Sequence, residues 1–470
     1  MSLVLEARKS DMNILLLNAG SSSLKGTLME CPASVPLSPR GGEGKPSSLP
    51  PGGGEGKWSP LSPAAGERGR GEGIDGAVVV AHCLADWAGS PTRYQYAGPD
   101  GKERSEEVPW RGHAKAVERF VFDLMHKEPA VLPDRTGLAA VGQRVVHGGQ
   151  FTSSVRITPQ IRTRITALAD LAPLHNPPSL ETLAAAEAQL PGVPHVAVFD
   201  TAFHATLPPE ARTYPVPDRW TRDWGIHRFG FHGLSHAYCA RRAAEMLSRV
   251  SVVARSPDRA TVGRPWHNAE DSRLVICHLG HGCSASAVRG GRCVDTTMGF
   301  TPLEGLMMAT RSGSIDPSIV LHVQQHHGLT AQQVETALNR ESGLLGVSGI
   351  SADMRQVLAA AKEDHEQARL ALGIYTHRVR QAIGALAVTM GGIDALVFTA
   401  GVGEHASEVR QSICAGLECL GLELDAQANA GCRPDADVAS PSSRGRILVI
   451  ATREDVTMLR EITQVLSGKP

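Results

Sequence analysis

The sequence has few aromatic residues, no excess of either charge and no long hydrophobic run. Aromatic residues make up 4% of the 470-residue chain, which argues against stacking surfaces for single-stranded nucleic acid. Lys plus Arg total 47 and Asp plus Glu total 48, and the net charge of −1 argues against binding nucleic acid or anionic membranes through bulk positive charge. Because no run of about 18 uninterrupted apolar residues occurs, no membrane-spanning helix is expected.

The cysteines lack the pattern of a disulfide or metal framework. There are nine, an odd number, and none forms a C-x-x-C pair. A disulfide scaffold and a four-cysteine zinc site are therefore not expected, and the expected location is a reducing cytoplasm. The apolar run at 14–17 is too short for a secretory signal and follows charged residues. Patterning typical of a fold begins near Met12, so we expect residues 1–11 to be an extension.

Short apolar runs alternate with amphipathic segments, which indicates an α/β fold. Buried strands are expected at 13–18, 24–30, 76–84, 138–147, 195–200, 273–279, 394–399 and 446–451. Helices are expected at 113–126, from a cap at Ser179 to 190, from 233 to 247, from a cap at Asp364 to 390, at 407–420 and from 454 onward.

Two segments interrupt this alternation. Residues 33–73 consist mainly of Gly, Pro, Ser, Glu and Arg, and Gly-Gly-Glu-Gly-Lys occurs twice within them, at 41–45 and 53–57. Such a segment buries too little apolar surface to offset its ordering entropy, so we expect a disordered insertion between two strands. Residues 254–271, with Pro, Arg, Trp and His, are expected to form a second inserted loop.

A strand–turn–strand pattern at 14–30 recurs at 273–295. The first turn reads Asn-Ala-Gly-Ser-Ser-Ser and the second Gly-His-Gly-Cys-Ser-Ala-Ser; aligning Gly20 with Gly282 places the copies 262 residues apart. The repeat suggests a duplicated two-lobe architecture with a cleft between the lobes. Small residues let backbone N–H groups approach a phosphate, although an ordinary hairpin is the simpler interpretation of either copy alone.

Three glycine motifs bear on nucleotide binding. The segment 20–25 lacks the Gly-Lys pair of a P-loop, and Gly280-x-Gly282 is followed by a strand where a dinucleotide fold requires a helix. The run from Gly401 to Ala406 has a predicted strand before it and a helix after it. It favours a nucleotide contact over a complete dinucleotide site, because no full mononucleotide unit follows.

Charged residues inside apolar segments are further candidates. Arg144 and Arg311 must be paired or face a cleft, and each suits either a phosphoryl contact or a structural ion pair. Asp200 at a strand end and Glu454 at a helix start are candidate magnesium ligands, although Glu454 also suits a helix N-terminus. The 19 histidines contain no H-E-x-x-H motif, and those near strand ends favour a polar cleft over a metal hydrolase.

Nine segments together resemble the acetate kinase family, which groups with sugar kinases, heat-shock chaperone ATPases and actin. The resemblance covers almost the whole chain from Met12 apart from the two insertions. The segments are NAGSSSLK (18–25), RVVHGG (144–149), APLHNPPSL (172–180), VFDTAFH (198–204), RFGFHGLSH (228–236), HLGHGCS (278–284), DTTMGFTPLEGLMMATRSG (295–313), ESGLLG (341–346) and FTAGVGEH (398–405).

The resemblance implies a duplicated two-lobe, actin-like ATPase architecture with a central nucleotide cleft. We expect an N-terminal lobe at 12–200 and a C-terminal nucleotide-binding and dimerisation lobe at 201–440. A final strand and helix at 441–470 should return to the first lobe. A homodimer is implied, with acetate and ATP as substrates, and neither nucleic acid nor membrane is expected as a partner.

The implied reaction is reversible transfer of the γ-phosphoryl group of ATP to acetate, with Mg²⁺ or alternatively Mn²⁺. The catalytic residues implied by the matching segments are Arg144, His175, Asp200, His232 and Arg311. The implied pocket for the acetate methyl, beside Arg144, consists of Val146, Leu174, Phe231 and Pro302. The implied ATP contacts are Ser21, Ser23, Lys25, His278, Gly280, His281, Gly282, Asp353, Met354, Arg355, Gly401, Val402, Gly403, Glu404 and His405. The implied metal ligands are Asn18, Asp200 and Glu454.

Several positions depart from the family pattern. His281 and His405 stand where Asn is usual, Ser314 replaces an Asp, and Arg453 lies in T-R-E-D where T-N-E-E is usual. Three alternatives remain: a propionate or butyrate kinase, which pocket volume would decide; a catalytically weakened nucleotide-binding scaffold; and a Rossmann dehydrogenase, which the strand after Gly282 argues against.

Overall fold

The computed structural model describes residues 12–32, 77–132, 134–173, 175–254 and 272–468. By their contacts, the residues form two units, Met1–Gly142 with Glu181–His195, and Gln143–Leu180 with Val196–Pro470. The expected extension at 1–11, the insertion at 33–73 and nearly all of the second inserted loop lie outside the described residues. The lobe boundaries predicted at 200 and 440 differ from this division and remain predictions.

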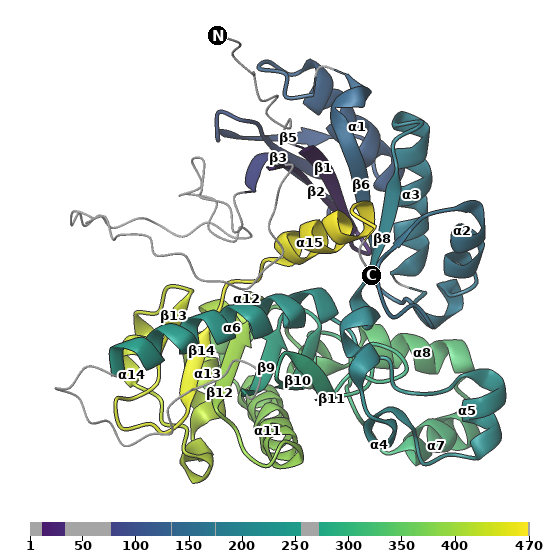
Figure 1. Ribbon diagram of the computed structural model, residues 1–470. Coiled ribbons are helices and arrows are strands. Elements are labelled where there is room, and N and C mark those ends of the chain that lie inside the picture. The colour runs from purple at the N-terminus through teal and green to yellow at the C-terminus, as the bar shows by residue number, and fades with distance from the viewer. Residues whose placement is uncertain (1–11, 33–76, 133, 174, 255–271, 469–470) are drawn as a thin grey trace. The chain divides into compact units, whose positions relative to one another are not determined.

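Strands and helices alternate, which confirms the α/β class (Figure 1). The strands are β1 (Met12–Ala19), β2 (Ser23–Cys31), β3 (Val78–Asp86), β4 (Thr92–Ala97), β5 (Glu103–Val108), β6 (Leu138–Val145), β7 (Val155–Arg156), β8 (His195–Phe199), β9 (Arg273–Leu279), β10 (Cys283–Arg289), β11 (Arg292–Thr296), β12 (Ala395–Thr399), β13 (Ala436–Asp437) and β14 (Arg446–Val449). The helices are α1 (His113–His126), α2 (Pro159–Thr166), α3 (Asn176–Gln189), α4 (Pro209–Arg212), α5 (Asp218–Trp224), α6 (Gly233–Ala254), α7 (Pro317–His327), α8 (Ala331–Arg340), α9 (Gly343–Ser348), α10 (Met354–Lys362), α11 (Glu366–Thr389), α12 (Ala400–His405), α13 (Ser407–Cys414), α14 (Ala426–Ala430) and α15 (Glu454–Leu466).

The first unit is built on a sheet in which β1 to β5 pair antiparallel with their neighbours. Its strands follow the order β5-β4-β3-β2-β1-β6, and β1 pairs with β2 so that Asn18 lies opposite Lys25. Leu15 and Leu17 alternate onto the face that α1 covers, where they pack in one core with Phe120. Gly26 is required on this face, because a Cβ atom there would lie 2.3 Å from the Phe120 ring.

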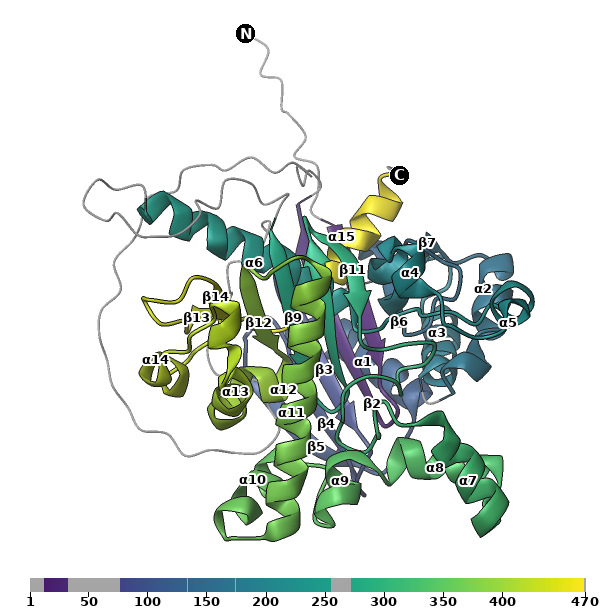
Figure 2. The same cartoon turned by 90° about the horizontal axis from the view of Figure 1, so that it is seen from below.

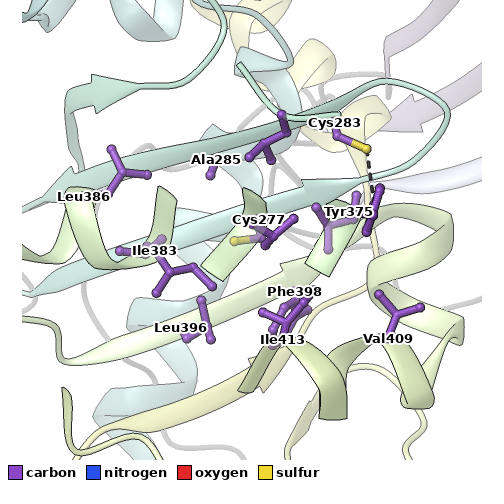
Figure 3. Close-up of a cluster of buried hydrophobic side chains, with 14 of the residues drawn as sticks. Cys277, Cys283, Ala285, Tyr375, Ile383, Leu386, Leu396, Phe398, Val409 and Ile413 are labelled. Atoms are coloured by element: carbon purple, nitrogen blue, oxygen red, sulfur yellow. Dashed lines mark hydrogen bonds between the residues drawn. The ribbon is translucent and has the colours of Figure 1, made fainter. Parts of the chain in front are cut away.

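The second unit contains a sheet in the order β11-β10-β9-β12-β14-β13 among its described strands. Strands β9, β12 and β14 are parallel, whereas β10 and β11 form antiparallel hairpins. Alternate residues of β9 and β10 face opposite sides: Cys277 and Ala285 pack in the core with α11, and His278 and Ser284 bond to residues of α6. Figure 3 shows Tyr375 and Ile383 of α11 in this core. Figure 2 shows α11 running the length of the sheet.

Strand β6 ends in the second unit. In the order of the sheet, β8 and the short β7 follow it. All five residues of β8 are buried, and the strand stops at Phe199, directly before Asp200. Strand β6 stops at Val145, directly before the Val-His-Gly-Gly segment. Both strand ends therefore deliver residues of the predicted catalytic set.

Three details of the predicted pattern are corrected. Helix α3 starts at Asn176 rather than with a cap at Ser179, because Pro177 and Pro178 suit a first helical turn that needs no N–H donors. His365, not Asp364, caps α11 and accepts from the N–H of Ala368. The strand ends align Gly20 with Gly280, 260 residues apart, rather than with Gly282, because β1 ends at Ala19 and β9 at Leu279.

Within the described residues, no helix combines the length and the hydrophobicity needed to cross a bilayer.

Candidate functional site

The turn at 280–282 joins β9 to β10 and is held from two sides. Within the turn, the N–H of Gly280 donates to the carbonyl of Gly282 at 3.1 Å. On the core side, Cys283 Sγ donates to the carbonyl of Gly280 and lies 3.3 Å from the Tyr375 hydroxyl. Burial raises the pKa of the Cys283 thiol to about 11, so the thiol stays neutral. On the other side, the N–H of Ala309 donates to the carbonyl of His281. The turn is thus fixed before any ligand arrives.

Two strained residues border this turn. His232 and Ala400 have φ values of 57° and 65°, in the left-handed region that favours glycine. A Cβ atom on Gly282 would lie 3.2 Å from His232 Nε2, and one on Gly280 would lie 3.6 Å from the Ala400 Cβ. Strain of this kind costs about 1–3 kcal/mol and clusters at functional sites. The turn and its two neighbours therefore form the centre of the candidate site.

His232 is oriented by contacts on several sides. Its backbone N–H donates to the carboxylate of Asp200, and the next residue must be Gly233 because a Cβ atom there would lie 1.9 Å from the Asp200 carbonyl. Its Nδ1 lies 2.9 Å from Ser284 Oγ, and its ring stacks on His278 with centroids 4.1 Å apart. Burial and the neighbouring histidines hold the pKa of His232 well below its usual value. The ring is therefore neutral near pH 7.

Arg311 carries a positive charge that no carboxylate of the described residues balances. Its Nη1 donates to the Pro302 carbonyl at 3.0 Å, and its Nη2 lies 3.2 Å from His175 Nε2. Burial lowers its pKa, and no acidic side chain of the described chain opposes that effect. Burial and Arg311 lower the pKa of His175 to about 3, so this imidazole is neutral and accepts from Arg311. Because a Cβ atom on Gly282 would lie 3.6 Å from Arg311 Nη1, an anion at this turn would meet an uncompensated guanidinium.

Arg144, by contrast, is engaged by two carboxylates. Its Nε and Nη2 donate to Asp200 at 2.9 and 2.6 Å, and its Nη1 lies 3.4 Å from Glu454. Burial raises the pKa of Asp200, while Arg144 and the His232 N–H act in the opposite direction. Since both Asp200 oxygens accept from Arg144, this carboxylate holds the arginine in place. The two predicted arginines are therefore not equivalent.

Two of the four residues predicted to surround a methyl group lie in an apolar cluster. Val146 and Phe231 belong to one buried cluster, and Pro302 joins Arg311 through its carbonyl. Leu174 lies outside the described residues. Phe229, which was not predicted, belongs to the same cluster, and the ring of His147, one of the histidines near strand ends, lies 4.4 Å from that of Phe229. The spacing Phe229-Gly-Phe231 was the available signal.

The segment that holds this cluster is fastened by one asparagine. Asn176, at the start of α3, accepts from the N–H of His147 at 3.0 Å and donates to its carbonyl at 3.1 Å. Gly148 follows, and a Cβ atom there would lie 2.8 Å from the Phe199 ring. Val146 is therefore held by backbone bonds rather than by its own packing alone.

The predicted ATP contacts of the second unit divide into two groups. The first group gathers at the ends of β9 and β12, where His278 lies opposite Thr399 in the parallel register. There Glu404 Oε1 accepts from the N–H groups of Ala400 and Thr452, each at 2.9 Å, which gives this residue an anchoring role. Gly401 faces open space, since a Cβ atom there would meet no described atom within 4 Å, and Val402, Gly403 and His405 complete α12.

The second group lies at the start of α10. Asp353 caps this helix by accepting from the N–H of Arg355 at 2.9 Å, and the two side chains also pair. The Arg355 hydrogen bonds lower the pKa of Asp353, which keeps it ionised. Met354 is buried beneath them. Asp353 and Arg355 thus bond to each other, and their predicted contact with adenosine remains a prediction.

The predicted contacts of the first unit lie on its β1–β2 hairpin. Asn18, Ser21, Ser23 and Lys25 all belong to this hairpin, and Lys25 is exposed. Around the turn, His113 Nε2 lies 2.8 Å from the Gly20 carbonyl, and the N–H of Trp87 donates to the Ser22 carbonyl. The position of these residues is described within the first unit only.

The departures from the family pattern are accommodated locally. Ser314 exchanges two hydrogen bonds with the backbone of Gly305, at 2.9 and 3.1 Å, within the loop that carries Arg311. His281 uses its backbone carbonyl, and its side chain is exposed, as is that of His405. Arg453 pairs with Asp455.

Among the described residues, no group of three or more His, Cys, Asp and Glu side chains is arranged to hold a metal ion. Asp200 and Glu454 nevertheless approach the same Arg144 guanidinium. Mg²⁺ in phosphoryl-transfer sites is bound by one or two carboxylates, with substrate phosphates and water supplying the remaining ligands. These two carboxylates fit that partial set.

The chain is similar to known proteins over most of its length. The acetokinase family model matches residues 75–460. The chain is 41% identical over 459 residues to an acetate kinase of Cyanothece sp., covering 97% of this chain and 98% of that one. It is 47% identical over 380 residues to an acetate kinase of Gloeobacter violaceus, covering 78% and 89%.

Two solved structures resemble the whole chain. The acetate kinase of Porphyromonas gingivalis has a TM-score of 0.75 and 32% identity over 97% of this chain and 100% of that one. A propionate kinase of Francisella tularensis has a TM-score of 0.74 and 32% identity over 96% and 98%. The expected fold is thereby confirmed.

Proposed function

This chain belongs to the acetokinase family, and we propose that it reversibly transfers the γ-phosphoryl group of ATP to acetate, giving acetyl phosphate and ADP, by direct in-line attack. One observation of the structure carries the proposal: the unbalanced guanidinium of Arg311 and the ring of His232 converge on the Gly282 turn. Phosphoryl transfer depends mainly on positioning and charge stabilisation rather than on covalent chemistry by the protein. A cation and a neutral hydrogen-bond donor at a glycine turn suit that requirement.

The site residues of the second unit then have distinct roles. Arg311 stabilises the negative charge of the migrating phosphoryl group, with neutral His175 holding its Nη2. His232 donates to the same group. Arg144 is proposed to contact the acetate carboxylate, while Asp200 fixes the orientation of the arginine. Because acetate is already ionised at neutral pH, the attack requires no general base.

The apolar cluster accounts for a preference for a carboxylate substrate with a short acyl chain. Val146 and Phe231 are buried beside the Arg144 strand end, and a methyl group suits such surroundings better than a hydroxyl or a charge. Pro302 connects this pocket to Arg311 through its carbonyl. Leu174 is proposed as its fourth member.

Mg²⁺, or Mn²⁺ in its place, is proposed to accompany ATP and to neutralise phosphate charge. Glu454, Asp200 and Asn18 would hold it, directly or through its water ligands. The ATP phosphates are proposed to lie along the turns that contain Ser21, Ser23, Lys25, His278 and 280–282. Adenosine is proposed to contact Asp353, Met354, Arg355 and 401–405.

A hydroxamate assay for acyl phosphate tests the proposal directly. The purified chain is incubated with MgATP and acetate, and Arg311→Ala is assayed beside it. We expect acetyl phosphate from the wild type and a loss of about 100-fold or more in the variant. Absence of acyl phosphate from the wild type, with ATP shown to bind, would instead favour a nucleotide-binding scaffold.

A propionate kinase is the second candidate, because the solved structure of a propionate kinase matches the chain at the same 32% identity as a solved acetate kinase. Acetate, propionate and butyrate assayed in parallel separate the two. A higher kcat/KM for propionate than for acetate would identify propionate as the preferred substrate.

We also propose a homodimer formed through the second unit, in the cytoplasm. Helix α11 presents a face on which Leu370 and Val388 are 50% and 74% exposed, beside the open Gly373 and Gly384. Exposed apolar side chains in line with glycines suit close helix packing against a second copy. Sedimentation at micromolar concentration should show a dimer that Val388→Asp weakens, and a monomeric wild type would contradict this.

A further inference from the structure

The Nδ1 side of His232 is occupied by a buried hydroxyl group that it shares with a second histidine. His232 Nδ1 lies 2.9 Å from Ser284 Oγ, and the same oxygen lies 2.8 Å from His236 Nε2. Ser284 and His236 have no exposed surface. One hydroxyl therefore bridges two imidazoles, and because it carries one hydrogen, it donates to only one of them.

The far nitrogen of His236 decides the direction of this bridge. His236 Nδ1 is buried and has no hydrogen-bond partner within the described residues. If Ser284 donated to His236, the hydrogen of neutral His236 would sit on Nδ1 as an unpaired buried N–H. Orphaned buried N–H donors are rarer than under-satisfied acceptors. The favoured direction therefore runs from His236 Nε2–H to Ser284 Oγ, and from Ser284 O–H to His232 Nδ1.

This direction determines which ring nitrogen of His232 carries the hydrogen. Burial and neighbouring histidines hold the pKa of His236 well below its usual value, so this ring is neutral. A neutral His232 that accepts at Nδ1 carries its hydrogen on Nε2. That atom would lie 3.2 Å from a Cβ on Gly282.

We propose that Ser284 and His236 are positioning residues that hold His232 in the Nε2–H tautomer and aim this N–H at the Gly282 turn. The inference rests on the proposed function in one respect, namely that the acceptor is the transferring phosphoryl group. His232 donates this N–H in a hydrogen bond and keeps the hydrogen, so no proton is transferred. His278 sets the ring plane by stacking, and Ser284 sets the tautomer.

Three variants of one strand test the bridge. Ser284→Ala removes it, Ser284→Thr keeps the hydroxyl, and Ser286→Ala is the matched control. Ser286 lies two residues further along the same face of β10, is equally buried, and bonds to Thr296 rather than to a histidine. Loss of a group that orients a catalytic side chain typically costs about 10- to 100-fold. We expect that loss in kcat for Ser284→Ala, partial rescue by Ser284→Thr, and little change for Ser286→Ala.

The KM for ATP should change less than about threefold in Ser284→Ala, because the ATP contacts remain in place. A merely structural role would affect KM, kcat and the thermal midpoint together. Wild-type kcat in a folded Ser284→Ala would overturn the proposal. If Ser284→Ala does not fold, His236→Gln, which keeps an N–H at the Nε2 position, is compared with His236→Leu. Equal kcat in these two variants would overturn it as well.

A spectroscopic readout separates this inference from the proposed function. Long-range ¹H–¹⁵N spectra of the ¹⁵N-histidine-labelled full chain distinguish the two neutral tautomers, and His232→Gln assigns the signal. We expect Nε2–H in the wild type and a mixture of tautomers in Ser284→Ala. An Nδ1–H tautomer in the wild type would overturn the bridge. If no carboxylate is phosphorylated, the proposed function fails, while these spectra still decide the direction of the bridge.

Discussion

The hairpins β1–β2 and β9–β10 share a small-residue turn but have different surroundings. In the first, the turn carbonyls of Gly20 and Ser22 face His113 and the N–H of Trp87. In the second, the turn lies against Arg311 and His232, which come from the loop after β11 and from the segment before α6. Similar turns allow a similar backbone approach to a phosphate. The charge beside the second turn comes from distant parts of the chain.

Acidification should give the largest difference in stability between the two hairpins. Burial lowers the pKa of His278 to about 4 and that of His175 to about 3, and holds that of His232 well below 6.5. Folding keeps these rings neutral, whereas the unfolded chain protonates them below about pH 6.5. Their contribution to stability is therefore complete above pH 6.5 and is lost as the pH falls.

From pH 7 to pH 5, His278 and His175 together should remove on the order of 4 kcal/mol of unfolding free energy, and His232 should act in the same direction. Denaturant titrations at the two pH values measure the total, and hydrogen exchange locates it. Amides of β9 and β10 should lose more protection than those of β1 and β2. Equal loss in both hairpins would show that the second turn is not the acid-sensitive region.

Arg311→Ala should reduce kcat/KM by about 100-fold or more, corresponding to roughly 3 kcal/mol of transition-state stabilisation. The thermal midpoint should change little, because the Pro302 carbonyl and the His175 ring that Arg311 contacts are both neutral. Arg289→Ala, at the exposed far end of β10, is the control. Near-wild-type kcat/KM in Arg311→Ala would remove this arginine from the site.

Arg144→Ala should behave differently from Arg311→Ala. It leaves the buried Asp200 carboxylate without its partner, and breaking such a pair costs about 3 kcal/mol or more of stability. Unfolding in urea should therefore shift to lower concentration together with the loss of turnover. An unchanged urea midpoint would mean that the Arg144–Asp200 pair contributes nothing to stability.

Gly282→Ala and Gly20→Ala compare the two turns directly. The new methyl at 282 would lie 3.2 Å from His232 Nε2, which must move, and we expect about a tenfold loss of kcat, or roughly 1.4 kcal/mol. The new methyl at 20 would lie 2.7 Å from Ser23 Oγ, a hydroxyl that rotates away, so a smaller loss is expected. Both losses are measured as kcat at saturating ATP. A larger loss in Gly20→Ala than in Gly282→Ala would indicate that the reacting group lies at the first turn.

Val146→Ala should give the smallest effect. The enlarged pocket should raise kcat/KM for propionate relative to acetate, by about 1 kcal/mol for one methylene. The KM for ATP should not change, because Val146 lies in the cluster of Phe231 and not at the turn. If the substitution alters ATP affinity and leaves the acyl ratio unchanged, Val146 does not form part of the pocket.

Most elements were predictable from local pattern. Helix α1 and strand β9 have the predicted bounds, because amphipathic and apolar periodicity at these lengths leaves little choice. The caps at Ser179 and Asp364 were wrong because a local cap signal competes with neighbours: two prolines in one case and His365 in the other. The α13 segment also ends at Cys414, with a separate 3₁₀ turn at Leu417–Leu420, rather than running to 420 as one helix.

The candidate site was predictable only in part. Arg144 and Arg311 were both identified as arginines in apolar surroundings, with an ion pair or an anion contact left open for each. Local sequence cannot choose between these, because the partners lie 56 residues away for Arg144 and 136 residues away for Arg311. The Ser284 bridge was missed for the same reason, since its two histidines lie on or next to α6 and the serine lies on β10.

The α/β alternation, the two glycine turns and the residue types available for phosphoryl transfer follow from local sequence pattern. Periodicity, turn propensity and the rarity of charge in apolar runs are local properties, so they can be read residue by residue. Only the tertiary structure decided which arginine is neutralised, which histidine nitrogen faces the turn and which serine connects them. Those outcomes depend on burial and on distances between segments far apart in the chain, and electrostatic and hydrogen-bond energies change most steeply with these two quantities.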